Sequence, residues 1–184
     1  MSFPREIVIK RIRNELRDCS QYLGNDISIE DDLELPLELD MRISNVLAYE
    51  SPDKVISEHG FKIIITEDYG QRKPEVRWTS HIFHPNIMDP DDGGLVCMRM
   101  LDDWDYGTRL VTFLSSIVAL LSNPNPRSPF GTDSCMAAAR FFAESNKAKF
   151  DVVVNRRYYE DRLGRKGRNG VQEKDRSDGR TVRT

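Results

Sequence analysis

The sequence predicts an α+β fold in a single domain. Three observations support this prediction: an apolar stripe near the N-terminus, alternating and apolar runs between residues 37 and 83, and two helical patterns after residue 108. A helix, then strands, an irregular loop and further helices is an order typical of α+β domains. With 184 residues, the chain is long enough for one such domain around one core. We place the domain at residues 1–163, followed by a tail at residues 164–184.

The first predicted element is an N-terminal helix that begins near Pro4, since proline is tolerated in a first helical turn. Val8, Ile12 and Leu16 recur every four residues and form one apolar stripe over a helix of about fifteen residues. The opposite face is basic, and such a face is either solvated or a binding surface. Its four residues are Lys10, Arg11, Arg13 and Arg17.

The next elements are predicted strands. The alternation in LELDMRIS (37–44) and the apolar run FKIIIT (61–66) are typical of strands, and ESPDKVISEHG (50–60) is expected to be a turn-rich connection. Val76 and Trp78 add strand positions in the following segment. Up to residue 83 the pattern therefore predicts a helix followed by an antiparallel meander.

Two helices are predicted after the irregular loop. TRLVTFLSSIVALL (108–121) has leucines and phenylalanine at spacings of three and four, which indicates a largely buried helix. The prolines of NPNPRSP end it. Thr132 or Asp133 is expected to cap a second helix, which alanines and phenylalanines extend towards residue 163.

Composition and charge narrow the possible partners. The chain is 39% hydrophobic and 31% charged, with no apolar run near the roughly 20 residues that span a bilayer. Charges scattered through the first residues give no indication of a signal peptide. The net charge of −3 does not indicate a nucleic-acid partner. We therefore expect neither a nucleic-acid nor a membrane partner. The tail carries seven basic and three acidic residues and almost no apolar ones, so it is predicted to be disordered.

The cysteines indicate a reducing compartment. There are three, Cys19, Cys97 and Cys135, an odd and sparse set. This disfavours a disulfide at Cys97 and predicts a cytoplasmic or nuclear location. Neither the cysteines nor the three histidines have metal-ligand spacing, so no metal and no cofactor is expected. Cys19 and Cys135 lie in predicted helices and are expected to be small buried hydrophobes.

Cys97 follows an unusual stretch, FHPNIMDPDDGGLVC (83–97). A partly exposed cysteine is a good nucleophile, and its thioester can pass an acyl group to an amine. A prolyl turn, the side-chain amide of Asn86 and the glycine pair Gly93–Gly94 would suit such a site. A cysteine-protease dyad with a nearby histidine lacks its usual local signatures. From the residues alone, a buried structural cysteine and a nucleophile both stay open.

The segments HIFHPNI, GGLVCMRMLDDW and SSIVALLSNPNPRSP resemble the active-site half of ubiquitin-conjugating enzymes. In that family an HPN tripeptide, a cysteine, a tryptophan and an apolar helix ending in PNP occur in this order. The resemblance extends more weakly over residues 4–162. It implies an N-terminal helix, a four-stranded antiparallel meander, an active-site loop and C-terminal helices.

The resemblance also implies an activity. Cys97 would accept ubiquitin or a ubiquitin-like protein from an activating enzyme as a thioester, and would pass it to a lysine. Asn86 would donate to the oxyanion that forms during this attack, or would hold the loop in shape. Ser128 falls at the gate for the attacking lysine. The neighbouring residues that the resemblance assigns to structure are His84, Pro85 and Trp104.

The partners follow from the same resemblance. The four basic residues of the N-terminal helix would meet the activating enzyme. Two loops, represented by Gln71 and Tyr106, would meet a RING- or HECT-type ligase, although both loops differ from the usual family pattern. No metal or small cofactor is implied.

Other departures leave alternatives open. The interval from Asn86 to Cys97 is eleven residues, longer than in common members, and its insertion MDPDDGG is acidic. Such a loop would either reposition the nucleophile or add a specificity element. The strand LELDMRIS lacks a tryptophan common in ubiquitin-specific members and resembles neddylation-type enzymes. A neddylation-type conjugating enzyme is therefore one alternative, and a non-catalytic modifier-binding variant of the fold is another.

Overall fold

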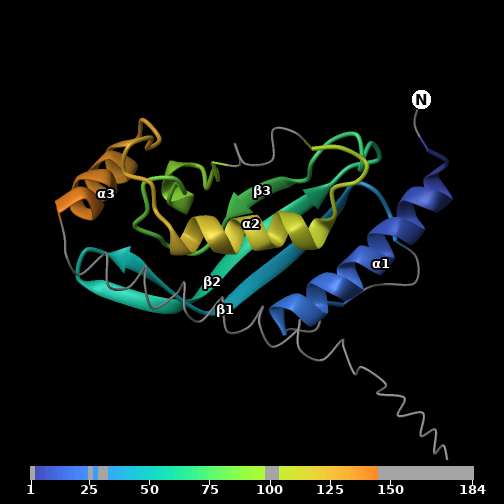
Figure 1. Ribbon diagram of the computed structural model, residues 1–184, viewed down its shortest axis with the longest axis horizontal. Helices are drawn as coiled ribbons and strands as arrows, with labels where there is room; N and C mark the ends of the chain where they lie inside the picture. Colours follow the sequence, from blue (N-terminus) through green and yellow to red (C-terminus); the bar gives the residue numbers. More distant parts are fainter. Residues whose placement is uncertain (1–2, 25–26, 29–32, 98–103, 145–184) are drawn as a thin grey trace, which may run out of the picture.

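A computed structural model describes residues 3–24, 27–28, 33–97 and 104–144. Helices and strands follow one another in the predicted order, which confirms the α+β class (Figure 1). The elements are α1 (Arg5–Leu23), β1 (Leu37–Ser51), β2 (Lys54–Ile65), β3 (Glu75–Trp78), a 3-10 turn η1 (Pro90–Asp92), α2 (Leu110–Ser122) and α3 (Asp133–Glu144).

The described strands form one antiparallel sheet in the order β1-β2-β3. Met41 pairs with Phe61, and both side chains are buried on the inner face. On the outer face the Glu38 carboxylate accepts a hydrogen bond from the Lys62 ammonium (3.0 Å). The period of two along each strand separates these two faces. Of the four strands expected, three lie within the described residues.

The predicted connection at residues 50–60 is wrong in extent. β2 already begins at Lys54, and its first residue pairs with Ser51 at the end of β1. The turn is confined to Pro52 and Asp53, and the polar side chains after it lie on a strand. His59 is buried there, and its Nε2 lies 2.8 Å from the Val46 carbonyl. The proline and the polar residues in this short stretch therefore led to the prediction of a connection where the structure has a long hairpin.

α1 covers part of the inner face, beside α2 (Figure 1). The predicted stripe of Val8, Ile12 and Leu16 is buried, each side chain contributing about 1.5–3 kcal/mol of burial energy. The helix is longer than expected because Cys19 and Leu23 continue the stripe. It ends at Gly24, whose backbone is left-handed (φ 72°).

α2 lies across the sheet, and α3 lies at the end of the molecule away from α1 (Figure 1). Phe113, Leu114 and Ile117 of α2 are fully buried. The Thr132 hydroxyl accepts a hydrogen bond from the Cys135 N–H (3.3 Å), which confirms a cap at the predicted position. The Tyr49 ring contacts the Phe141 ring edge-on (5.0 Å) and so ties α3 to β1. The predicted helix beyond residue 144 and the tail lie outside the described residues.

Within the part of the chain that the structure describes, no helix combines the length and the apolar character needed to cross a bilayer.

Candidate active site

Cys97 is half-buried and carries a free thiol. Its N–H donates to the Asn86 carbonyl (2.9 Å), and the Met88 N–H donates to the Leu95 carbonyl (2.8 Å). An isolated bridge between Ile87 and Val96 lies between these two bonds. Residues 86–88 and 95–97 therefore form a short antiparallel ladder, which fixes the backbone of Cys97 against the HPN tripeptide.

The acidic insertion continues from this ladder as a loop whose backbone is held by hydrogen bonds. The Asp89 carboxylate accepts hydrogen bonds from the Ile82 and Asp91 N–H groups (both 3.1 Å). Gly94 has a left-handed backbone (φ 64°), and its carbonyl accepts from the Trp78 N–H (2.8 Å). A Cβ on Gly94 would lie 2.4 Å from the Trp78 carbonyl oxygen, so only glycine fits this close approach.

The insertion is also held from the side of α3. The Ser134 hydroxyl donates to the Asp92 carboxylate, and the Cys135 thiol lies 3.6 Å from the Ile87 carbonyl oxygen. Cys135 and Cys19 are both buried, as predicted. Burial, with Glu15 and Asp18 adding to it, raises the pKa of Cys19 to about 12. That thiol therefore stays protonated and inert.

Asn86 is buried and bridges the ladder to the turn after α2. Its side-chain oxygen accepts from the Asn125 N–H (2.7 Å), and its Nδ2 donates to the carbonyls of Asn125 (3.1 Å) and Ser128 (2.9 Å). Both amide hydrogens are thus directed at backbone carbonyls. In this arrangement the side chain clips the 125–128 turn to the segment that carries Cys97. The Ser128 side chain is exposed.

His84 and Pro85 shape the same segment. The His84 Nδ1 accepts from the Asn86 N–H (3.0 Å), which assigns the proton to the other ring nitrogen. Burial lowers the pKa of His84 to about 3, with the Leu120 carbonyl opposing the shift and His59 adding to it. A neutral, buried imidazole orients the loop and is a poor general base at neutral pH. The Pro85 carbonyl accepts from the Phe130 N–H (2.9 Å).

Trp104 is a packing residue in this structure. Its ring centroid lies 5.9 Å from that of Tyr69 and 5.9 Å from that of Phe113. It therefore anchors the chain that returns after Cys97. Residues 98–103, between the two, lie outside the described residues.

The basic face of α1 is divided. Lys10 and Arg17 are exposed and Arg13 is half-buried, and together with Ile9 they line a shallow groove of about 450 Å³. Arg11 differs, because its Nε donates to the Glu15 carboxylate (2.7 Å) and its Nη2 to the Thr108 carbonyl (2.7 Å). The prediction grouped four cations by helical face alone and missed this internal use of one of them.

The two predicted ligase loops lie near the N-terminus of α1. Gln71 is exposed, and Tyr106 is 41% exposed. The Phe3 ring meets the Tyr106 ring edge-on at 4.8 Å and is itself 50% exposed. Phe3 was not predicted as a site residue, because it precedes α1 and no periodic pattern includes it. We call Phe3 and Tyr106 the aromatic pair.

One cluster among the described residues has metal-ligand types. The side-chain ligand atoms of His81, Asp89 and Asp91 lie within 4.8 Å of one another. The Asp89 carboxylate is already engaged by two N–H groups, and it raises the pKa of His81, which favours the protonated ring. An ion pair and a turn cap therefore account for this cluster.

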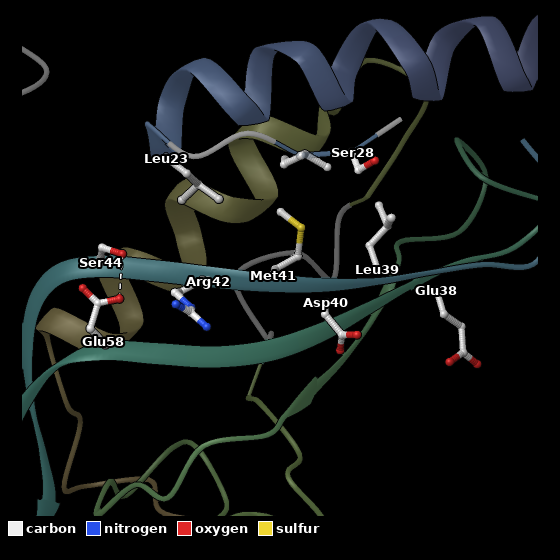
Figure 2. Close-up of a pocket in the computed structure, with 10 residues that line it drawn as sticks. Leu23, Ser28, Glu38, Leu39, Asp40, Met41, Arg42, Ser44 and Glu58 are labelled. Carbon is white, nitrogen blue, oxygen red and sulfur yellow. Dashed lines mark hydrogen bonds between the residues drawn. The ribbon is translucent and has the colours of Figure 1, made fainter. Parts of the chain in front are cut away.

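A groove of about 550 Å³ lies beside β1, below the end of α1 (Figure 2). Leu39 and Met41 point into the space under the helix, whereas Glu38 and Asp40 point to the opposite side of the strand (Figure 2). Its lining residues include no cysteine or histidine, so this groove offers neither a thiol nor an imidazole.

Comparison with known proteins identifies the family of the chain. The family model described as ubiquitin-conjugating enzyme matches residues 44–157, which is more than half of the chain. The chain therefore belongs to the ubiquitin-conjugating enzyme family.

Curated relatives support the assignment, and a solved structure shares the fold. Ubiquitin-conjugating enzyme E2 N of Drosophila melanogaster is 36% identical over 54% of this chain and 66% of its own length. Ubiquitin-conjugating enzyme E2 3 of Arabidopsis thaliana is 35% identical over 60% of this chain and 70% of its own length. A Plasmodium yoelii structure described as a ubiquitin conjugating enzyme superposes with a TM-score of 0.58 at 24% identity, covering 85% of this chain and 96% of that one. The chain thus spans slightly less than two thirds of the Drosophila relative, and the last similarity concerns the fold alone.

Proposed function

We propose that the chain is an acyltransferase that carries ubiquitin, or a ubiquitin-like modifier, as a thioester on Cys97. The observation that supports this most directly is the half-buried free thiol held against the HPN tripeptide by the Cys97–Asn86 backbone bond. Such a thiol is accessible to a partner, and the hydrogen-bonded backbone of Cys97 holds it in one place. Two steps of acyl transfer would use it.

In the first step the Cys97 thiolate attacks the thioester carbonyl that joins the modifier to the activating enzyme. The new Sγ–C bond forms, and the thiolate of the activating enzyme leaves. In the second step a neutral lysine amine attacks the same carbonyl carbon. An amide bond forms, the C–S bond breaks, the Cys97 thiolate leaves, and the amine proton is released to solvent. ATP is consumed earlier, by the activating enzyme.

The surroundings of Cys97 supply the support for this chemistry. Asn86 holds the 125–128 turn in place, and Ser128 would line the approach of the lysine from that turn. Because Ser128 is exposed, a lysine side chain could approach Cys97 from the side of this turn. In this proposal Asn86 acts mainly by fixing the turn.

Partner surfaces lie on α1 and its neighbours. The exposed cations Lys10 and Arg17, with Arg13, would bind acidic groups of the activating enzyme. The aromatic pair, with Gln71 at its side, would receive a ligase, since exposed aromatic rings often become anchors of protein interfaces.

A charging assay tests the proposal. The chain is incubated with activating enzyme, ATP and either ubiquitin or the neddylation-type modifier, and adducts are separated with and without DTT. We expect a DTT-sensitive adduct with one modifier, which Cys97→Ala abolishes and Cys97→Ser converts into a DTT-resistant oxyester. Cys135→Ala, which removes a buried cysteine instead, serves as the matched control and should charge normally. No adduct with either modifier would favour a non-catalytic modifier-binding variant.

A further inference from the structure

A buried carboxylate connects α1 to the Tyr69 loop and to the first residue of α2, both outside the candidate active site. Glu15 is 5% exposed, and one of its oxygens accepts from the Tyr69 hydroxyl and from the Leu110 N–H, each at 2.6 Å. The other oxygen accepts from the Arg11 Nε (2.7 Å). Leu110 begins α2, whose own N-cap residue supplies no side-chain bond. Glu15 therefore caps α2 from a distant helix.

Arg11 extends this connection to the loop that carries Tyr106. While its Nε bonds to Glu15, its Nη2 donates to the Thr108 carbonyl (2.7 Å), and its guanidinium lies 5.1 Å from the centroid of the Tyr69 ring. The planar guanidinium presents several donors in fixed directions, so one side chain serves both partners. A lysine ammonium carries its donors on one nitrogen atom and would not bond to both the Glu15 carboxylate and the Thr108 carbonyl with the same geometry.

Tyr106 lies beside these contacts. The Asp105 carboxylate accepts from the Gly107 (2.8 Å) and Thr108 (3.0 Å) N–H groups and makes residues 105–108 a tight turn. The Tyr106 ring lies over Gly70, because a Cβ on that glycine would come within 3.0 Å of it. The same Cβ would lie 2.9 Å from the Arg11 Nη1. Arg11 and Tyr106 thus meet at one glycine.

We propose that Arg11 and Glu15 are positioning residues that hold Tyr106 in the aromatic pair, and that Arg11 is not a contact for the activating enzyme. This inference rests on the proposed function, in which the aromatic pair receives a ligase and the exposed cations of α1 receive the activating enzyme. α1 then serves both partners with separate residues: its exposed cations bind the activating enzyme, and Arg11 sets the geometry of the neighbouring loop.

The test compares Arg11→Lys with Arg17→Lys in the full chain. Both keep the charge, but only Arg11 bonds to Glu15 and Thr108, whereas the Arg17 guanidinium has an exposed bond to Asn14 (3.3 Å). Three quantities are measured: the KM for the activating enzyme in charging, the discharge of the thioester to free lysine with and without a RING domain, and the NMR amide shifts of residues 105–110.

For Arg11→Lys we expect shifted amides at residues 105–110 and a fall in RING-stimulated discharge of at least about fivefold, the factor that one hydrogen bond is worth. The KM and the unstimulated discharge should stay within about twofold of the unmodified chain, since neither depends on the aromatic pair. Arg17→Lys should leave the amides of residues 105–110 unchanged.

Two results would overturn the inference. One is an increased KM for the activating enzyme in Arg11→Lys with unchanged amides at residues 105–110. The other is no change in any of the three measurements. If no RING domain accelerates discharge of the unmodified chain, the ligase part of the proposed function fails, and the amide shifts alone decide on positioning. Should Arg11→Lys not fold, Tyr69→Phe removes a single bond to Glu15 and should shift the same amides by less.

Discussion

Replacing Asn86 by alanine separates two explanations of its role. The side chain makes three hydrogen bonds to the 125–128 turn, at 2.7, 2.9 and 3.1 Å, and is 3% exposed. Each bond contributes about 1 kcal/mol net, which sets an upper estimate of about 3 kcal/mol. Because Asn125 and Ser128 are exposed, water will replace part of this loss. We therefore expect Asn86→Ala to lower the free energy of unfolding by about 1.5–3 kcal/mol.

Urea unfolding followed by tryptophan fluorescence would measure this, with the midpoint falling by roughly 1 M. Asn123→Ala is the matched control, since it removes an exposed amide that donates to the Ala119 carbonyl (2.8 Å), and it should change the unfolding free energy by no more than about 0.5 kcal/mol. In parallel, thioester discharge to free lysine is timed for each variant. A hundredfold slower discharge of Asn86→Ala at unchanged stability would refute the loop account and make Asn86 an oxyanion donor.

Further predictions concern stability. His84, whose pKa burial lowers to about 3, and His59, whose pKa burial also lowers, stay neutral in the fold while they protonate when unfolded. The contribution of His84 to stability should therefore be full above about pH 6.5 and fall by about 1.4 kcal/mol per pH unit as the pH decreases towards 3. His59 should add to this fall, and His59→Gln should reduce it in urea unfolding. Gly94→Ala should lower the thermal midpoint far more than Gly93→Ala, because both have positive φ but a Cβ on Gly93 has no atom within 4 Å. Glu15→Ala leaves the Arg11 cation unpaired and should cost about 3–5 kcal/mol in urea unfolding, whereas a loss under 1 kcal/mol would contradict the buried pair.

Local patterns in the sequence predicted the elements that depend on local physics. The stripe of Val8, Ile12 and Leu16 and the cap at Thr132 are properties of neighbouring residues, and the structure confirms both. The first half of β2 was missed because Pro52 and Asp53 are strong turn formers and the residues after them are polar. Their strand pairing depends on partners across the hairpin, which no local pattern displays.

In the candidate site, too, some residues could be predicted from local motifs and others depend on distant partners. Cys97, Asn86 and His84 were recognisable from the order of short motifs along the chain. The internal use of Arg11 was not, because it depends on the Thr108 carbonyl, 97 residues away. Glu15 likewise meets Tyr69 and Leu110 across 54 and 95 residues. A charged residue on a helical face gives no sign in the sequence of whether it turns outward or reaches a distant backbone group.

The ladder between residues 86–88 and 95–97 separates the length of the preceding loop from the placement of the thiol. The hydrogen bond between Met88 and Leu95 closes the ladder. Residues 89–94 lie beyond it and are attached to the rest of the domain through hydrogen bonds of Asp89 and Gly94. We therefore expect changes in the length or charge of this segment to leave the sulfur atom in place. The acidic insertion is thus a segment that a protein engineer could exchange while Cys97 keeps its place on the ladder.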